Sequence, residues 1–403
     1  MYARDQAPDA RLQGYRLNIE PMGSRALHDC LPGQLWELLV RTAGDPGPGM
    51  NVLTHRMRLL MREPGESRPD PADGTHAVSR ATLRRILLAG LDEVHFGKEF
   101  TRYEQDGERV TAHFADGTSA TGTLLVGADG ARSRVRQQLL PHARVIATGG
   151  FGVGGKLALT DETASWLPPS LLQSKNMIMP RKDFLFTAVF RRRVSAEQTD
   201  DLRGQLAAAG IDADDALREA KEPDYVMWAY VAHDARHPAA GPVPGPGAGP
   251  ADSGEKLRDA IASRNAGWDP RLRRLVAASD PATVSRFEFT AALPVKPWPT
   301  GNVTLLGDAI HHMPPVGGIG GNIALCDARD LCQALRQAQP GQVRAAVAEY
   351  ERTMLPRGFG AVSASRRYLH LAISRNPALR VTALGFFRLC GAVGPLRRAV
   401  FAD

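Results

Sequence analysis

Two aspartates stand out because each follows an apolar run and precedes a glycine-containing stretch. Asp308 follows Val303–Leu306, and the loop after it carries Pro314, Pro315 and several glycines before an amphipathic helix. A carboxylate there can accept hydrogen bonds from sugar-like hydroxyls, and glycines let a flat ring approach the backbone because no Cβ intervenes. The helix start adds unpaired N–H groups and a partial positive charge. The pattern is typical of a site for a polar cofactor.

A second segment repeats the pattern far away in the sequence. The strand-like run Leu124–Val126 leads to Asp129 and Gly130, and an Arg-rich helical turn follows. Together the two stretches resemble the internal fingerprints of the single-component FAD-dependent monooxygenases, the aromatic-hydroxylase family. The resemblance implies that Asp129 and Gly130 lie near the FAD pyrophosphate and the nicotinamide cofactor. It also implies that a second group of residues holds the ribityl chain and the flavin ring: Asp308, Pro315, Gly318, Gly320, Gly321 and Asn322.

Two arginines complete the expected cofactor site. A helix is predicted from Ser79, its N-cap, to a stop at Gly90, because apolar residues recur at helical spacing: Leu83, Ile86, Leu87 and Leu91. The resemblance implies that Arg80, in the first turn, faces FAD, and a surface arginine is the alternative. Arg11 is the other arginine expected to contact the cofactor.

The beginning of the chain departs from the family pattern. Family members open with a strand, a G-x-G-x-x-G turn, a helix and a second strand that ends in an acidic residue, and this unit holds the ADP half of FAD. Here Tyr2–Asp5 resembles the tail of that second strand, with Ala3 at the acidic position. The expected fold class is therefore α/β: an FAD-binding Rossmann-like domain without its N-terminal βαβ unit, an inserted sheet-based substrate domain and C-terminal helices. A misassigned start or a real truncation would both give this pattern.

The expected division of the chain has three parts. Residues 1–142 and 291–403 would form the FAD-binding part with the C-terminal helices, and residues 143–290 would form the substrate domain. Aromatic residues of the middle part are candidates for the wall of the substrate pocket, with ordinary sheet core as the alternative: Phe184, Phe186, Phe190, Trp228 and Tyr230. The low-complexity stretch 239–254 predicts a surface loop or a lid. No catalytic residue can be assigned, although His55, Tyr225 and His233 are possible acid–base groups.

Two other patterns look functional and are set aside. The segment Gly150–Leu157 fits G-x-G-x-x-G and most of a P-loop, but Leu157 lacks the hydroxyl that holds magnesium, and the segment predicts a strand. His311 and His312 are adjacent, which seldom aims two imidazoles at one ion, so no metal site is expected. In the family pattern the first histidine serves packing and loop hydrogen bonding.

Bulk composition narrows the class of protein. The chain has 403 residues, 43% of them hydrophobic, and a net charge of +7 with scattered arginines and only 6% aromatic residues. These values favour a globular protein over a nucleic-acid-binding one. Four cysteines without metal or disulfide spacing are expected to be buried thiols in a reducing compartment, which favours the cytoplasm. No signal peptide and no stable membrane insertion are expected, although the apolar C-terminal stretch leaves a membrane-surface role open.

The leading functional hypothesis is an FAD-dependent monooxygenase of secondary metabolism. It would use NAD(P)H and dioxygen to hydroxylate or epoxidise a small organic, aromatic molecule. A truncated, FAD-deficient remnant or a non-enzymatic interaction protein is the alternative. A flavin halogenase is disfavoured because Trp228-Ala229-Tyr230 departs from the W-x-W-x-I-P motif, whereas a flavin reductase remains open. The substrate, the choice of NADH or NADPH and the oligomeric state are not predicted.

Overall fold

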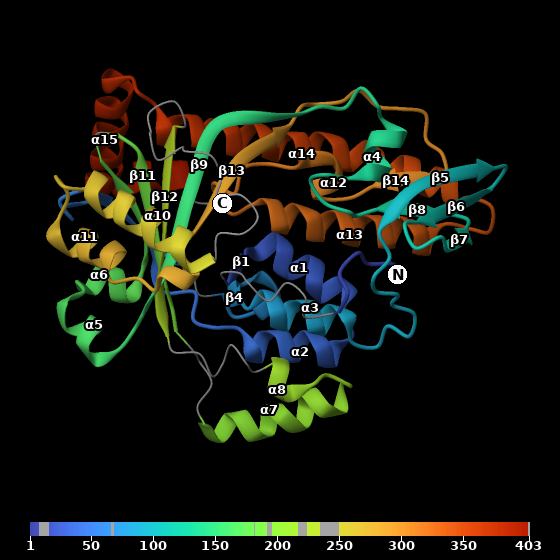
Figure 1. Ribbon diagram of the computed structural model, residues 1–403, viewed down its shortest axis with the longest axis horizontal. Coiled ribbons are helices and arrows are strands. Elements are labelled where there is room, and N and C mark those ends of the chain that lie inside the picture. Colours follow the sequence, from blue (N-terminus) through green and yellow to red (C-terminus); the bar gives the residue numbers. More distant parts are fainter. Residues whose placement is uncertain are drawn as a thin grey trace.

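A seven-stranded sheet and a set of helices with three small sheets form the two sides of the molecule (Figure 1). The computed structural model describes residues 1–7, 16–65, 68–180, 182–191, 196–216, 224–233 and 250–401. Arg11 and most of the low-complexity stretch lie outside these ranges. No single helix among the described residues is long and apolar enough to cross a membrane. One bent pair, Pro377–Ala392 with Gly394–Val400, passes that test by length and composition only.

The seven strands follow the order β13-β9-β12-β11-β10-β2-β3. Neighbours are antiparallel except β10 and β2, which are parallel. The strands are β2 (Gly49–Thr54), β3 (Leu59–Pro64), β9 (Val145–Ala158), β10 (Lys175–Met179), β11 (Phe184–Phe190), β12 (Tyr225–His233) and β13 (Ser285–Ala292). The sheet thus takes in β2 and β3 from the N-terminal part of the chain. The glycine-rich segment 150–157 lies inside β9, as the strand prediction required.

The two faces of this sheet are both covered. Its outer face packs against four helices, α5 (Asp161–Trp166), α6 (Pro169–Gln173), α10 (Pro250–Arg264) and α11 (Pro270–Ala277). Its inner face meets the long helix α14 (Val343–Ile373) and α15 (Pro377–Ala392), where Phe289, Leu369 and Phe387 share one apolar cluster. Figure 1 shows this arrangement, with the outer helices to the left of the strands.

Three small sheets lie on the other side. β1 (Leu17–Ile19) pairs antiparallel with β4 (His76–Val78), and β8 (Leu125–Gly127) pairs parallel with β14 (Val303–Leu305). The third sheet is the antiparallel meander β5 (Phe100–Asp106), β6 (Arg109–Phe114) and β7 (Ser119–Gly122). Val110, Ala112 and Phe114 alternate along β6 and are all buried.

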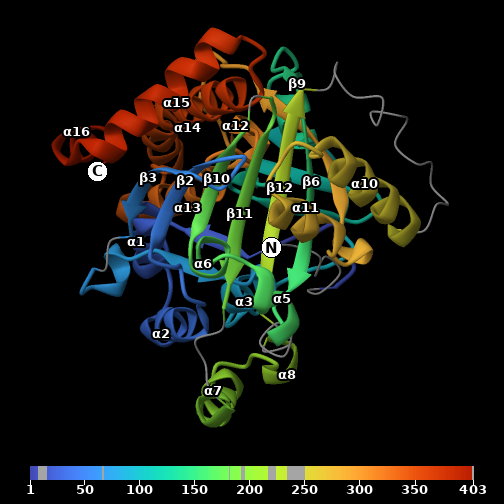
Figure 2. The ribbon, with the colours of Figure 1, turned by 90° about the vertical axis from the view of Figure 1, so that its left-hand side faces the viewer.

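The remaining helices lie around these small sheets, except the last one, which follows α15 and bonds to β3 through Arg397 (Figure 2). They are α1 (Pro21–Cys30), α2 (Gly33–Thr42), α3 (Arg80–Leu88), α4 (Arg134–Leu139), α7 (Ala196–Ala208), α8 (Ala213–Ala216), α12 (Asp308–His311), α13 (Gly320–Gln337) and α16 (Gly394–Phe401). In α3 the side chain of Ser79 accepts the N–H of Thr82, which confirms the predicted N-cap. Leu83 and Ile86 are buried, but Leu87 and Leu91 are exposed, so the predicted apolar face was too wide.

Two of the five candidates for the pocket wall belong to the ordinary sheet core, which was the alternative. Trp228 and Tyr230 are fully buried in the outer core, where Trp228 Nε1 donates to Ser279 Oγ at 2.7 Å, so they are not pocket wall. All four cysteines are free thiols, but Cys30 and Cys332 are exposed rather than buried. Helix α14 continues through Pro356 to Ile373, because its packing outweighs the one hydrogen bond that proline removes.

Candidate cofactor and substrate site

The two aspartate loops leave the same edge of one strand pair. In the parallel register of β8 and β14, Thr304 lies opposite Val126 and Leu305 lies opposite Gly127. Asp129 and Asp308 therefore follow the carboxyl ends of neighbouring strands. Cofactors commonly bind outside the carboxyl ends of parallel strands, where the loops diverge.

Asp129 closes its own loop onto a helix start. Its Oδ2 accepts the N–H of Arg134 at 2.8 Å and that of Val135 at 3.4 Å, at the beginning of α4. Gly130 has φ +80°, a left-handed conformation that side chains seldom adopt, and this turns the chain toward the helix. The Asp-Gly pair is thus required by the geometry of the turn.

Arg136 joins the two aspartate loops. Its guanidinium is buried, donates from Nη1 to the carbonyl of Ala309 at 2.7 Å, and donates from Nη2 to the carbonyl of Ala131 at 2.9 Å. Burial lowers the pKa of Arg136, and the nearby charge of Asp129 opposes that shift. One side chain from α4 therefore fixes the distance between the loop after β8 and helix α12.

The loop at Asp308 rests on a buried charged cluster. Gly307 has φ +60°, and its N–H donates to Oδ2 of Asp327 at 3.1 Å. The same oxygen lies 2.5 Å from Nε2 of His311, and Nη2 of Arg357 donates to the other carboxylate oxygen at 2.9 Å. His311 and Asp327 are fully buried. The carboxylate of Asp308 itself is half-exposed, and Nδ1 of His312 lies 3.5 Å from it.

Helix α14 supports this segment at successive points. Tyr350 donates its hydroxyl to the carbonyl of Leu305 at 2.9 Å, and Glu351 accepts the hydroxyl of Thr304 at 2.8 Å. Further along the helix, Ser365 donates to the carbonyl of Pro314 at 2.7 Å. The strand, the short helix α12 and the proline loop are therefore all held by one helix.

Asn322 fastens the start of α13 to the N-terminal part of the chain. Its amide donates to the carbonyls of Asn18 and Gly318, each at 3.2 Å, and its side-chain oxygen accepts the N–H of Glu20 at 2.9 Å. A Cβ on Gly23 would lie 2.2 Å from that oxygen, so the close approach of α1 requires glycine. The side chain of Asn322 is buried in these contacts, and its role is to shape the loop.

The start of α13 is open. Its N-cap, Ile319, makes no side-chain capping hydrogen bond, so the first N–H groups of the helix lack a side-chain acceptor at that position. Gly318 has φ +70°, and a Cβ on Gly318 or Gly321 would meet nothing within 4 Å. Pro315 is exposed in the same loop, and Gly320 is half-buried beside Met313.

Arg80 lies beside this region on a different element. It is exposed at the first position of α3, directly after β4 and Ser79. The partner of β4 is β1, whose Asn18 carbonyl accepts the amide of Asn322. The expected cofactor arginine is thus attached to the ribbon that borders the start of α13.

Lys175 is a half-buried basic residue at the start of β10. Met177 and Met179 of β10 pack into the inner cluster, and strand alternation puts Lys175 on the same face. The register aligns Lys175 with Met50 and Glu63 in one row across three strands. Burial lowers the pKa of Lys175, whereas Glu20 and Glu63 oppose that shift. The N–H of Glu20, one of these two acidic neighbours, is bonded to the side-chain oxygen of Asn322 in α13.

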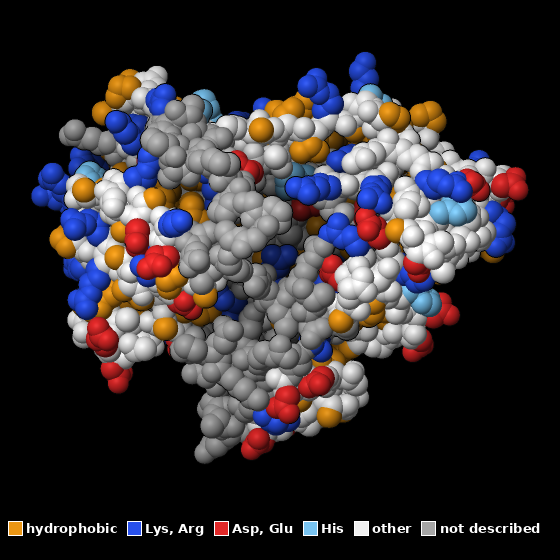
Figure 3. All heavy atoms as spheres, in the orientation of Figure 1, with side chains coloured by type: hydrophobic (Ala, Val, Ile, Leu, Met, Phe, Trp, Pro, Cys, Tyr) orange, Lys and Arg blue, Asp and Glu red, His pale blue; other side chains and the backbone are white. Residues whose placement is uncertain are grey.

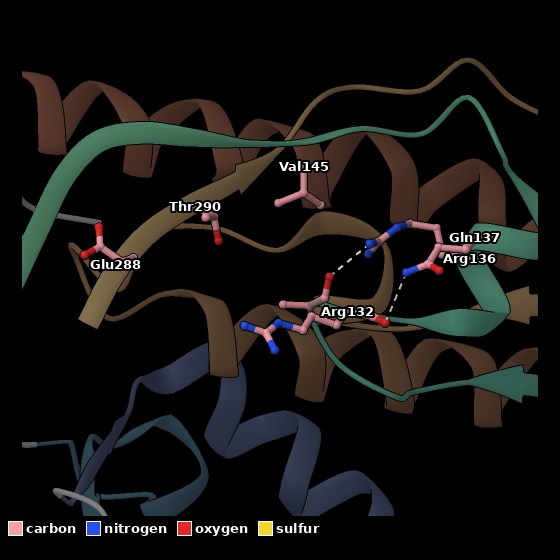
Figure 4. Close-up of a pocket in the computed structure, with 7 residues that line it drawn as sticks. Arg132, Arg136, Gln137, Val145, Glu288 and Thr290 are labelled. Carbon is pink, nitrogen blue, oxygen red and sulfur yellow. Dashed lines mark hydrogen bonds between the residues drawn. The ribbon is translucent and has the colours of Figure 1, made fainter. Parts of the chain in front are cut away.

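A cavity of about 520 Å³ opens beside the loop after β8 (Figure 4). Arg132, Arg136 and Gln137 line one side, and Glu288 and Thr290 of β13 line the opposite side. Arg136 and Gln137 are bonded to the carbonyls of Ala131 and Arg132, as the dashed lines show. Oγ1 of Thr290 lies 2.8 Å from Nε2 of His312, which links the cavity to the Asp308 loop.

The sequence matches the family profile of an FAD-binding domain over residues 72–210 and 272–365, more than half of the chain. The chain belongs to the FAD-dependent monooxygenases that share this domain. The match includes the loop after β8, the loop after β14 and the start of α13. It also includes strands β9, β10, β11 and β13 of the large sheet.

Individual relatives agree with this assignment. A dual O-methyltransferase/FAD-dependent monooxygenase of Phaeosphaeria nodorum is 30% identical over 82% of this chain and 37% of its own length. An FAD-dependent urate hydroxylase of Klebsiella pneumoniae is 30% identical over 75% of this chain and 65% of its own length. A solved structure from Photorhabdus luminescens, described as an FAD-containing monooxygenase, is 30% identical with a TM-score of 0.76, covering 92% of this chain and 91% of that one. The chain thus spans less than two thirds of the two curated relatives.

Several residues around the site were not foreseen from the sequence. Asp327 lies between Ile323 and Leu331 on the buried face of α13, and a charged residue at an apolar position is the signal that was available. Lys175 gave no signal, because it stands at the start of an otherwise ordinary strand. Of the acid–base candidates, Tyr225 lies on the inner face next to Phe190, at a ring distance of 5.1 Å, whereas His55 follows β2, where its carbonyl accepts the N–H of Asp269.

Proposed function

We propose that this protein is an FAD-dependent monooxygenase that uses NAD(P)H and dioxygen to hydroxylate or epoxidise a small, acidic aromatic molecule. The observation that carries the proposal is the arrangement of two loops and one helix start beside the carboxyl ends of β8 and β14. The loops of Asp129 and Asp308 leave neighbouring strand ends, and the open start of α13 lies after the second loop. The inner face of the seven-stranded sheet lies opposite, as the contacts of Val316 with its cluster support.

The residues present fit FAD. The half-exposed carboxylate of Asp308 can accept hydrogen bonds from the ribityl hydroxyls, and the open N–H groups at Gly320–Asn322 can donate to the electron-rich edge of the flavin ring. The space beside Gly318 and Gly321 accommodates a flat ring close to the backbone. When bound, FAD would carry electrons from NAD(P)H to dioxygen, so that one oxygen atom of dioxygen enters the substrate and the other leaves as water.

The inner face of the sheet would keep water away from the reaction. Phe184, Phe186 and Phe190 of β11 all point to this face, and they pack with Met177, Met227 and Tyr225. An apolar wall strengthens electrostatic interactions with the bound molecules and limits side reactions with water. Three of the five wall candidates from the sequence therefore remain part of the proposal.

The cavity beside Asp129 supports the use of a dinucleotide as reductant. Arg132 is exposed at this cavity and has no ion-pair partner among the residues that the structure describes. A guanidinium recognises phosphate through paired hydrogen bonds. We assign Arg132 to the phosphates of NAD(P)H, and a preference for NADPH over NADH that disappears in Arg132→Met would support contact with the extra phosphate.

Lys175 indicates the chemistry of the substrate. An ammonium group held in a partly desolvated position between Glu20 and Glu63 attracts an anion more strongly than one in water. A phenol or an acidic heterocycle would place its ionisable oxygen or nitrogen beside the ammonium group of Lys175, next to the proposed flavin site. The urate hydroxylase among the relatives acts on an acidic heterocycle, which agrees with this class. The four free thiols favour a reducing compartment such as the cytoplasm.

The test is reconstitution followed by turnover. Added FAD should give the visible spectrum of a bound flavin, and Asp308→Ala should weaken FAD binding at least about tenfold. Asp116→Ala, at an exposed turn of the meander, is the matched control and should bind FAD normally. With FAD bound, a panel of phenols and acidic heterocycles should stimulate NAD(P)H oxidation and oxygen uptake, and the product should gain one oxygen atom. A protein that binds no FAD, or that never couples oxygen uptake to product, would contradict the proposal.

A further inference from the structure

Helix α15 exposes an apolar face to solvent. Its exposed hydrophobic residues are between 37% and 69% accessible: Leu379, Val381, Phe386, Leu389 and Val393. The positions between them are small or uncharged, including Ala378, Thr382 and Gly385. Arg388 is the one charged side chain on this face, whereas surface helices normally carry charged residues on the side away from the core. A large exposed apolar face is typical of an interaction site.

The orientation of α15 is fixed by its opposite face. Arg380 is buried and donates to the carbonyls of Pro180 at 3.2 Å and Asp183 at 2.8 Å. Phe387 and Cys390 pack into the inner cluster of the large sheet. A Cβ on Gly391 would lie 2.1 Å from the carbonyl of Leu60, so the helix closely approaches β3. The exposed face cannot rotate inward without breaking these contacts.

The charge of this end of the chain is strongly one-sided. Residues 352–402 contain nine arginines and no aspartate or glutamate. The other 41 basic side chains of the protein are outnumbered by its 43 acidic ones, so the net positive charge of the chain resides in this stretch. Arg375, Arg388 and Arg398 are exposed at the ends of α15 and α16, and none has an ion-pair partner in the described part of the chain.

We propose that α15 and α16 form a docking face for an anionic lipid membrane. The apolar residues of α15 would enter the outer part of the bilayer, and the three arginines would bind lipid phosphates around them. Figure 2 shows both helices at the periphery of the molecule, and Figure 3 shows hydrophobic and basic side chains over α15 at the upper left. The chain bends by 116° between α15 and α16, so the docking face consists of two helices that run in different directions.

Charge complementarity favours a membrane over a second copy of the chain. An isologous dimer built on α15 would bring the arginines of one copy toward those of the other, without acidic residues in 352–402 to compensate them. An anionic surface offers many phosphates to the same arginines at once. The apolar residues also distinguish this face from a simple phosphate site, because free phosphate cannot cover them.

The experiment measures binding of the full chain, with FAD added, to vesicles by sedimentation. We expect binding to vesicles that contain phosphatidylglycerol, weak binding to pure phosphatidylcholine, and partial loss at high salt because screening shortens the reach of the arginines. Phe386→Ser/Leu389→Ser and Arg388→Glu/Arg398→Glu should each lower the apparent affinity at least about tenfold. Arg388→Lys/Arg398→Lys should retain most of it, and Leu91→Ser, an exposed apolar residue beyond α3, should change nothing.

Three results would overturn the inference. They are equal binding to both vesicle types, competition by inorganic phosphate that abolishes binding, and a concentration-dependent dimer that Phe386→Ser/Leu389→Ser dissolves. The last result would show that a second copy covers the face. Thermal unfolding of each variant checks that the fold is retained, and the vesicle assay is independent of monooxygenase activity.

Discussion

His311 and Asp327 share a hydrogen bond of 2.5 Å in the interior of the protein, on a carboxylate oxygen that also accepts the N–H of Gly307. The residue after Gly307 is Asp308, the carboxylate assigned to the cofactor. The position of that exposed carboxylate therefore depends on a buried cluster of polar and charged side chains behind it. Arg357, from α14, completes the cluster on the other oxygen of Asp327.

Asp327→Asn should reduce both stability and FAD binding. The substitution removes a buried negative charge and leaves Arg357 without its fully buried partner, and breaking such a pair costs about 3–5 kcal/mol. Urea unfolding and FAD titration measure the two effects. Asp330→Asn is the control, because Asp330 also pairs with Arg357 but is partly exposed, and its loss should cost less than about 1 kcal/mol. Equal effects of the two substitutions would contradict the role of the cluster.

Gly358→Ala should destabilise the protein although it lies within a helix. A Cβ at this position would come within 2.4 Å of the His311 ring, whereas a Cβ on Gly360, two residues along the same helix, would meet nothing within 4 Å. Alanine in an open helical position stabilises by about 0.5–1 kcal/mol. Thermal unfolding should therefore show a lower Tm for Gly358→Ala and an unchanged or higher Tm for Gly360→Ala. A change of Tm in the same direction for both variants would mean that the His311 ring moves aside without a loss of stability.

Ionisation of Glu351 should lower the free energy of unfolding as the pH rises above 4.5, the ordinary pKa of a glutamate. Burial raises the pKa of Glu351, against hydrogen bonds from Thr300, Thr304 and Trp298 that lower it. A carboxyl with a raised pKa binds its proton more tightly in the folded state, so its stabilising contribution is complete below pH 4.5 and is lost as the pH rises through the folded pKa.

Glu351→Gln isolates this contribution, because glutamine stays neutral. The free energy of unfolding of the variant, relative to the unmodified protein, should increase from about pH 4.5 toward neutral pH, by roughly 1.4 kcal/mol for each unit by which the pKa is raised. Denaturant unfolding at a series of pH values measures it. Glu349→Gln, on the exposed side of the same helix, should show a flat difference. If the difference in unfolding free energy did not change with pH for either variant, ionisation of Glu351 would not destabilise the folded state.

Lys175→Met should raise KM for an acidic substrate about tenfold or more, because a charge-assisted hydrogen bond is lost. FAD affinity should stay unchanged, and Lys175→Arg should recover most of the loss. In the unmodified protein KM should rise as the pH passes through the lowered pKa of Lys175, since the ammonium loses its proton there. Steady-state kinetics across pH measure both effects. A pH-dependent KM that persists in Lys175→Met would exclude this lysine as the substrate contact.

The sequence was most informative where the signal is local. An apolar run that ends in an Asp-Gly pair predicts β8 and its turn without knowledge of distant residues, and the N-cap at Ser79 is equally local. The pairing of β8 with β14 was not predicted, because the resemblance to a family implied only that both loops contact one cofactor. The residues that bind FAD remain a proposal, and Arg11 lies outside the described residues.

The misplaced residues depend on distant parts of the chain. Both faces of the large sheet are buried, so alternation along β12 separates Trp228 and Tyr230 from Tyr225 but cannot tell which face borders the cofactor side. Cys30 and Cys332 are exposed because of where α1 and α13 end their contact, which composition does not reveal. A proline such as Pro356 normally indicates the end of a helix. Here the packing of residues on both sides of it keeps α14 continuous.

Helix α14 fixes the spacing of successive residues in the chain between β14 and the proline loop. Its contacts with Leu305, His311 and Pro314 come from Tyr350, Gly358 and Ser365, in the same order along both segments. One inserted residue between the first and last of these would rotate every later contact by about 100° around the helix axis. The length of this stretch is therefore as tightly constrained as its chemistry, and homologues can vary its solvent-facing side chains far more freely than its number of residues.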